Sequence, residues 1–256
     1  MFTNTIFEFD GEKSTDYGLI LASLDISMKN VPFGIEREII EDKPSKTSIP
    51  YFFGIDKKPL YFTTTLVSEE NLNYETRINI VRWLFKDEYK PFISTDHPDI
   101  IFNCIVVEKP EKILIGNIPR VIELTFKCDA PWAWTPFITN HYDLSNNSTY
   151  QIITMENRSN IEKYNYPELW IKSLDGGTIS LQNNSDNGRI FKFENLQENE
   201  IIYIDNKLRQ VETNISSIYR LKNFNRNWLR LIYGINQIEV VGKCLIIMRT
   251  RYEISL

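Results

Sequence analysis

The chain has 256 residues, of which 42% are hydrophobic and 25% charged, enough for one large β domain or two ordinary ones. Its formal net charge of −5 argues against sequence-independent binding of nucleic acid, which needs clustered lysines and arginines. No apolar run approaches the roughly 20 residues that span a bilayer, and the first residues alternate like a strand rather than a signal peptide. We therefore expect synthesis and folding in a cytoplasm.

The first half of the chain predicts several strands. Apolar runs and period-2 alternation indicate strands at residues 7–9, 24–28, 60–66, 100–107 and 120–126. The polar residues 41–48, which include Pro44, predict a loop between two of these strands. Short apolar segments separated by polar turns favour a mainly β structure here.

One amphipathic helix interrupts these strands and is expected over about residues 73–89. Asn73 is its predicted N-cap, and Pro91 is expected to end it. Apolar residues at helical spacing predict its buried stripe, which consists of Tyr74, Ile78, Val81 and Phe85, widened by Ile80 and Leu84. The helix should lie across a sheet with its charged side in water.

From Gln151 onward the chain has no helical period, and turns such as Asp175-Gly176-Gly177 separate short apolar segments. The expected strands contain the pairs Leu169 and Ile171, Ile179 and Leu181, Phe191 and Phe193, Ile202 and Ile204, Leu229 and Leu231, Ile238 and Val240, and Leu245 and Ile247. We predict an all-β protein with one helix and two domains: an N-terminal β-barrel or sandwich over 1–136, a linker over 137–150, and a C-terminal β-sandwich over 151–256.

The segment Asp96-His97-Pro98-Asp99 is the most suggestive cluster of polar groups. Its histidine and carboxylates could bind a metal, but no further ligand stands at a recognisable metal-site spacing. The alternative is a turn that Asp caps and Pro holds in shape. We favour the turn and expect neither a metal nor a cofactor.

Catalytic groups are also scarce. His141 and Asp143 near Ser145 invite a hydrolase triad, but no nucleophile elbow surrounds any serine, and a linker position is favoured. Paired carboxylates could serve a glycosidase, but adjacent acidic residues are usually solvated. The three cysteines, Cys104, Cys128 and Cys244, lie far apart and predict buried, reduced thiols. We expect no enzyme; a cell-wall hydrolase is the weakest of the hypotheses.

Three tryptophans offer a different kind of site. Trp132, Trp134 and Trp170 could form a platform on which sugar rings stack, because aromatic faces bind the apolar faces of sugars. The alternative is that Trp132 and Trp134 pack at a domain junction and Trp170 lies in a core. We favour packing and keep sugar contact by Trp134 and Trp170 as a hypothesis.

Five segments in one order resemble the motifs of a single protein family. They are an aromatic strand and turn that lead to Gly18, a helix with Arg77 and Trp83, the turn Asp96-His97-Pro98-Asp99, an exit segment with Pro131 and Trp132, and a hairpin segment with Gly234 and Asn236. With them, the chain is similar to the distal tail protein (Dit, Sipho-tail family) of long-tailed bacteriophages and prophages, mostly of Gram-positive hosts. One departure is clear, because residues 49–54 stand where many members have a P-G-R-D-G turn.

The resemblance implies a structural hub at the tail tip of a virion, assembled in the bacterial host cytoplasm. N-terminal domains of a homo-hexamer would form a ring that joins the major tail tube protein to a tail-associated fibre or spike protein. The C-terminal domain would be a galectin-like β-sandwich. DNA would pass through the lumen without specific binding, and six copies of a chain with net charge −5 would carry −30. The alternative hypothesis is an adhesion module that binds host cell-wall carbohydrate; neither reading involves a membrane.

Overall fold

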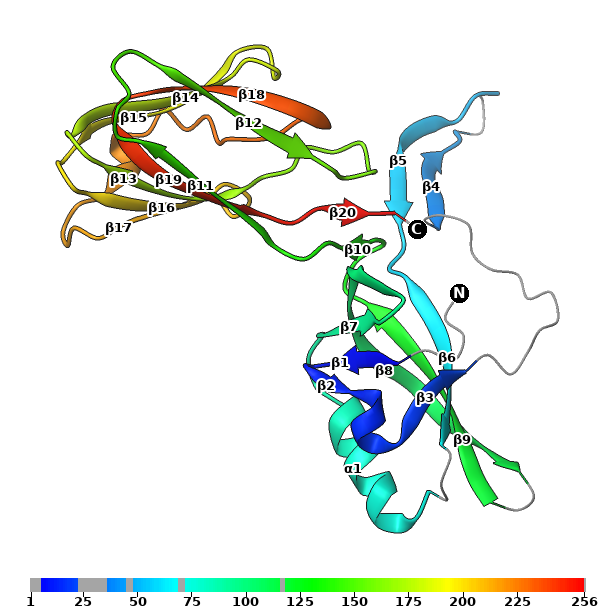
Figure 1. The fold of residues 1–256 in the computed structure, drawn as a ribbon. Helices are drawn as coiled ribbons and strands as arrows, with labels where there is room; N and C mark the ends of the chain where they lie inside the picture. The colour runs from blue at the N-terminus through cyan, green and yellow to red at the C-terminus, as the bar shows by residue number, and fades with distance from the viewer. Residues whose placement is uncertain (1–5, 23–35, 45–47, 69–71, 116–117, 256) are drawn as a thin grey trace. The chain divides into compact units, whose positions relative to one another are not determined.

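The computed structural model describes residues 6–22, 36–44, 48–68, 72–115 and 118–255, so the strand expected at 24–28 lies outside the described residues. The chain divides into two compact units, which are Met1–Thr135 with Ile254–Leu256, and Pro136–Glu253. Strands dominate both units, and the described residues hold a single α-helix (Figure 1). The predicted fold class, mainly β with one helix and two domains, is therefore confirmed.

The first unit is built on one sheet whose main path has the order β2-β1-β7-β8-β9-β6-β3, with neighbouring strands antiparallel. Two short strands extend it, because β10 pairs with β8 and also with β20. The strands of this sheet are β1 (Phe7–Phe9), β2 (Glu12–Lys13), β3 (Leu19–Ala22), β6 (Tyr61–Ser68), β7 (Lys90–Ser94), β8 (His97–Ile115), β9 (Ile118–Cys128), β10 (Ala133–Trp134) and β20 (Glu253–Ile254).

A second, two-stranded sheet of the first unit consists of β4 (Arg37–Asp42) and β5 (Tyr51–Lys57), which pair with each other antiparallel. Among the described residues, no other strand pairs with either of them. The loop predicted over 41–48 is therefore wrong at its start, because Glu41 and Asp42 are part of β4. Pairing with Phe52 and Tyr51 keeps these two acidic residues extended, which their polarity alone does not reveal.

The helix α1 spans Tyr74–Leu84. Asn73 caps its start as predicted, because its Oδ1 accepts a hydrogen bond from the Thr76 backbone N–H at 2.9 Å. The helix ends five residues before the predicted residue 89. Pro91 does not end it; this proline lies inside β7, where it sits opposite Asn103 of β8.

The predicted buried stripe of the helix is only partly right. Ile80 and Leu84, which widened that stripe, are buried together with Trp83, whereas Tyr74, Ile78, Val81 and Phe85 are exposed. Trp83 decides the orientation, because its Nε1 donates to the carbonyl of Phe9 at 2.8 Å inside the core. Burial of this large ring, whose polar atom has a hydrogen-bond partner, stabilises the observed orientation.

Aromatic side chains form the core beneath the helix. Phe92 packs against Phe7, Phe62 and Phe126 at ring-centroid distances of 4.9, 5.3 and 5.5 Å. Phe7 also stacks on Trp83 at 5.5 Å. These contacts join strands β1, β6, β7 and β9 to the helix, so the first unit has a complete core of its own.

The second unit contains two antiparallel sheets, one with the order β11-β19-β13-β16-β17 and one with the order β12-β18-β14-β15. A single buried cluster draws apolar side chains from both sheets. Its elements are β11 (Ile138–Leu144), β12 (Gln151–Asn157), β13 (Glu168–Ser173), β14 (Gly177–Asn183), β15 (Arg189–Leu196), β16 (Ile201–Asp205), β17 (Gln210–Thr213), β18 (Gly234–Val241), β19 (Cys244–Thr250) and the 3-10 turn η2 (Arg220–Lys222).

The predicted linker over 137–150 needs correction, because β11 occupies residues 138–144 and pairs along its length with β19. Its exposed residues alternate with more buried ones, and Leu144 reaches the core. Polar residues at the exposed positions hide this alternation in the sequence. Residues 254–256, predicted to belong to the second domain, instead belong to the first unit.

One strand prediction in the second half differs from the structure, and another is confirmed with a detail that the sequence leaves open. Leu229 and Leu231 are buried but lie in an irregular segment, where Leu231 forms only an isolated bridge with Asn165. In β19 the buried residues are Cys244, Ile246 and Met248, so the inward face is the one opposite to Leu245 and Ile247. Both faces of this strand are apolar in the sequence, and only packing decides between them.

Candidate functional site

The two-stranded sheet β4–β5, called the arm from here on, exposes apolar side chains on both faces. Neighbouring residues of a strand point to opposite faces, and the arm contains exposed apolar residues at adjacent positions. The exposed residues and their exposed fractions are Ile39 61%, Ile40 51%, Tyr51 59%, Phe52 64%, Phe53 69% and Ile55 44%. Within the described residues, neither face of the arm is covered. A two-stranded hairpin of this kind is at best marginally stable in water, so the arm needs a partner surface.

Charged groups fix the base of the arm. The ammonium of Lys58 lies 2.6 Å from a carboxylate oxygen of Asp56 and 2.8 Å from one of Glu38. Hydrogen bonds to these two carboxylates raise the pKa of Lys58. The backbone N–H of Lys58 also donates to the Glu36 carbonyl at 3.2 Å, which holds the start of β4 and the end of β5 together.

A second exposed apolar surface lies on α1 and consists of Tyr74, Ile78, Val81 and Phe85; it is called the helix stripe below. With Ile122 and Leu124 of β9 it borders a hollow of ≈ 530 Å³. Arg77 stands beside this stripe, where its guanidinium lies 6.0 Å from the Tyr74 ring and its Nε donates to the Asn73 carbonyl. The surface is thus an apolar groove with a basic rim.

Gly18 and Trp83, two residues of the family motifs, lie close together at the other side of the helix. Gly18 ends the 3-10 turn η1 (Ser14–Tyr17) with a φ of +64°, a conformation that glycine adopts without strain. This places Tyr17 flat on Trp83, with ring centroids 4.3 Å apart. Burial and the hydrogen bond to Glu12 raise the pKa of Tyr17 to about 12. The pair has a structural role, because it holds the helix to the turn.

The turn between β7 and β8 consists of Thr95 and Asp96, whereas His97, Pro98 and Asp99 already lie in β8, so the favoured turn hypothesis is right only at Asp96. Asp96, His97, Pro98 and Asp99 are all exposed, and the Asp96 backbone N–H donates to the Ser94 hydroxyl at 3.3 Å. Within the described residues, no three His, Cys, Asp or Glu side chains come close enough to hold a metal ion. The segment starts β8 and provides no ligand set.

The exit segment packs its tryptophans against each other. Pro131 and Trp132 are half-buried, and the rings of Trp132 and Trp134 meet edge to face at 6.1 Å. Trp134 is only 7% exposed, and its Nε1 donates to Asp129 at 3.4 Å. So small an exposed area leaves little of Trp134 for a sugar ring to stack on.

Trp170 lies on the outer face of β13, next to Tyr203 of the neighbouring strand at 4.9 Å. The guanidinium of Arg249 stands 5.2 Å from Trp170 and 4.9 Å from Phe137, and its Nε donates to Glu168 at 2.8 Å. Side chains of the same unit therefore already contact this ring. The expected core position of Trp170 is therefore wrong, because the ring is half-buried on the outer face of the strand, but its neighbours there leave less of it free for a sugar ring.

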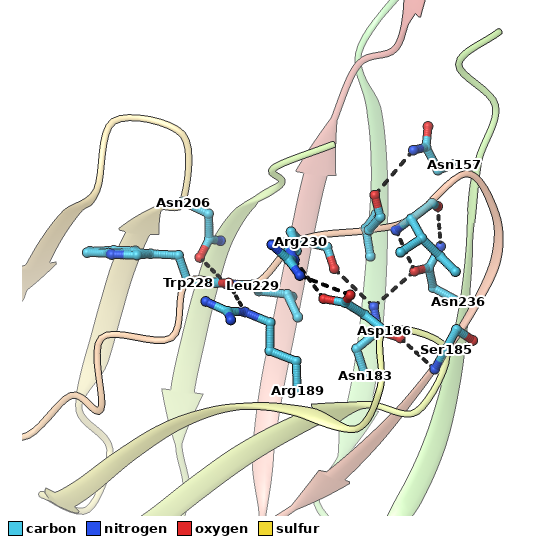
Figure 2. A network of polar contacts seen from close by, with 12 residues as sticks. Asn157, Asn183, Ser185, Asp186, Arg189, Asn206, Trp228, Leu229, Arg230 and Asn236 are labelled. Carbon is cyan, nitrogen blue, oxygen red and sulfur yellow. Dashed lines mark hydrogen bonds and ion pairs between the residues drawn. The ribbon is translucent and has the colours of Figure 1, made fainter. Parts of the chain in front are cut away.

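Gly234 and Asn236 belong to a polar network that supports the irregular segment before β18 (Figure 2). Asn236 is fully buried; its Nδ2 donates to the carbonyls of Ile232 and Gly234 at 2.8 and 3.0 Å, and its Oδ1 accepts from the Ile232 N–H and from Asn183. Gly234 has a φ of +82°. The side-chain amide of Asn236 thus provides hydrogen-bond partners for the backbone groups of the turn that leads into β18.

The same network contains an ion pair in which Arg230 binds both carboxylate oxygens of Asp186, at 2.7 and 3.1 Å (Figure 2). The side chain of Asn206 accepts from the Leu229 backbone N–H at 2.8 Å, and Asn183 donates to the Arg230 carbonyl at 2.9 Å. Side chains replace strand pairing here, which explains why Leu229 and Leu231 are buried without forming a strand. The sequence pattern of alternating leucines does not reveal this.

The catalytic alternatives gain no support from the geometry. Asp143 accepts hydrogen bonds from the Ser145 side chain and backbone, which hold its pKa below the usual range and make it a weaker base. Burial raises the pKa of Cys104, and raises those of Cys128 and Cys244 to about 12, so all three thiols stay protonated at neutral pH. The prediction of buried, reduced cysteines is confirmed.

Two family models together match most of the chain. One, described as a phage tail protein N-terminal domain, matches residues 2–130, and the other, a phage tail C-terminal domain, matches residues 132–249. The chain belongs to this family of phage tail proteins. It is 23% identical over 249 residues to the SPbeta prophage-derived uncharacterized protein YomH of Bacillus subtilis (strain 168), covering 96% of each chain.

Among solved structures, the fold matches that of the Dit protein of phage SPP1 with a TM-score of 0.68 and 13% sequence identity. The match covers 96% of this chain and 98% of the SPP1 protein, which is described as a paradigm of the hub adsorption apparatus in phages that infect Gram-positive bacteria. The chain is therefore a phage tail protein by family and has the fold of a Dit protein, in agreement with the expected resemblance. No helix among the described residues is long and apolar enough to cross a bilayer.

Proposed function

We propose that this phage tail protein is a structural hub of the tail tip, in which six copies form a ring. The ring joins the major tail tube protein on one side to a tail-associated fibre or spike protein on the other. DNA passes through the lumen without specific binding, since the chain has a net negative charge. Assembly takes place in the bacterial host cytoplasm.

One observation carries this proposal: the first unit has a complete core, and its arm nevertheless exposes apolar side chains on both faces. Monomeric proteins rarely leave such a surface uncovered. The arm and the helix stripe are different surfaces, so a contact between them joins copies head to tail, which is the kind of contact that closes into rings. Family membership and the Dit fold support a place in the tail.

We propose no catalytic role for this chain. The thiols are protonated and buried, and the serine of the candidate triad donates to Asp143 rather than being activated by a histidine. We do not propose that the chain binds cell-wall sugar, because Trp134 and Trp170 both pack against neighbouring side chains. We also make no proposal that the second unit is galectin-like.

The test is the mass and shape of the purified full-length protein. Native mass spectrometry should detect a species of six chains, and negative-stain electron microscopy should show rings with a central opening. A protein that stays monomeric at high concentration, and also in the presence of its tail neighbours, would contradict the proposal.

A further inference from the structure

The arm and the helix stripe are the two largest groupings of exposed apolar residues in the described part of the first unit. The arm contributes Ile39, Ile40, Tyr51, Phe52, Phe53 and Ile55, whereas the stripe contributes four side chains around a hollow. We infer that the arm of one copy packs into the groove of the helix stripe on the next copy. This inference rests on the proposed ring and identifies the two surfaces that would build it.

The connection through β6 keeps the arm away from its own helix. Three residues separate Lys57, where the arm ends, from the start of β6, and five residues separate the end of β6 from the start of α1. The arm connects to one end of β6 and the helix connects to the other. An eight-residue strand is about 26 Å long, and this length separates the two connections. β6 is also fixed in the sheet by pairing with β9 and β3. A second copy is therefore the occupant that fits the groove.

The charges at the two surfaces complement each other. Glu41 and Asp42 pair with Phe52 and Tyr51, so carboxylates stand beside the exposed aromatic rings of the arm. The helix carries Arg77 and Arg82 beside the stripe, and its only acidic residue is Glu75. Opposite charges at the rim of an apolar contact favour the correct pairing over contacts between two arms or two helices.

The contact uses a different surface on each copy, so every copy offers one arm and one groove. Repetition of such a head-to-tail contact produces a ring when the rotation closes. This property allows a direct test, because a variant with a damaged arm keeps its groove and a variant with a damaged groove keeps its arm. Neither variant can assemble with itself, but the two together can form one intact contact.

The test compares full-length Phe52→Glu, which damages the arm, with Val81→Glu, which damages the stripe. Each residue is more than half exposed, so neither change disturbs a core. Ile235→Glu, at a 63% exposed position of the second unit, is the matched control. Sedimentation velocity and native mass spectrometry measure assembly, and circular dichroism with thermal melting verifies that each variant is folded.

We expect Ile235→Glu to assemble like the wild type, and each of the two other variants to raise the apparent dissociation constant by roughly 30-fold or more. An equimolar mixture of Phe52→Glu and Val81→Glu should yield a heterodimer of one copy of each. Variants that assemble like the wild type, or a mixture that yields no heterodimer, overturn the inference and leave the proposed function standing. A wild-type protein that never assembles contradicts the proposed function itself.

Discussion

The two units of this chain differ in whether their own side chains complete them. In the second unit, the side chains of Asn183, Asn206 and Asn236 form hydrogen bonds with the backbone groups of the irregular segment that no strand pairs with. Its exposed apolar side chains are spread over several strands and turns. The first unit has an equally well-packed aromatic core but gathers its exposed apolar side chains on the arm and the helix stripe.

This difference means that different residues determine the stability of each unit and its association with other copies. The residues that stabilise each unit lie in its core, whereas the arm adds no side chain to the buried core of the first unit. Substitutions in the two cores should therefore change the free energy of unfolding, and substitutions on the arm should change association alone. The predictions below test this division, beginning with the largest expected effect.

Replacing Trp83 with Ala should destabilise the first unit by about 4–5 kcal/mol. The change creates a large cavity beneath the helix and leaves the buried carbonyl of Phe9 without its donor. Urea unfolding measures the loss, and hydrogen exchange should localise it to α1, η1 and β1. Exchange that increases equally in the second unit would show that the two units do not have separate cores.

Replacing Arg220 with Met should destabilise the second unit by about 3–4 kcal/mol. Arg220 and Glu200 form a buried ion pair, with Nε donating to Oε1 at 2.6 Å, and the change leaves the carboxylate buried and unpaired. The matched control is Arg158→Met, because Arg158 pairs with Glu156 at the surface. That control should leave the stability nearly unchanged, and a similar loss in both variants would contradict the role of burial.

Replacing Asn236 with Asp should cost about 2–3 kcal/mol in the second unit. The new side chain keeps an acceptor for the Ile232 N–H but can no longer donate to the Ile232 and Gly234 carbonyls. Thermal melting measures the change. A variant as stable as the wild type would mean that the turn before β18 does not depend on this amide.

The smallest expected effect is a pH dependence that comes from Glu200. Burial would raise its pKa, but hydrogen bonds from Arg220, Gln197 and Thr213 hold it below the ordinary value. This stabilisation is complete above the unfolded pKa of about 4.3 and is lost as the pH falls through the lower folded pKa. Denaturant melts should show the gap between wild type and Arg220→Met narrowing in acid, and a constant gap would contradict the assignment.

Much of the β structure could be predicted from the sequence, because alternation survives wherever one face of a strand is buried. Leu169 and Ile171, like Phe191 and Phe193, lie in strands and point into the core, as their spacing indicates. Asn73 likewise signals the helix start. These features depend on neighbours in the chain, which a sequence displays directly.

The remaining features depend on partners far away in the chain. The predicted stripe of α1 contained the buried Ile80 and Leu84 but not Trp83, whose burial depends on the distant aromatic rings of Phe7 and Tyr17. The arm escaped prediction because Ile39 and Ile40, or Phe52 and Phe53, place apolar groups on both faces and leave no alternation. Adjacent apolar residues between charged ones, as in Glu38 to Glu41, are the signal that could have indicated it.

The pairing of β11 with β19 has a consequence for how this protein can change over evolution. Ile138 lies opposite Thr250, so the chain enters and leaves the second unit on neighbouring strands. The unit is thus an insertion with adjacent ends, carried by a chain that returns to the first unit for its last residues. Such a cassette can be exchanged for another domain, or enlarged at its outer turns, while the scaffold that carries it keeps its own sheet intact.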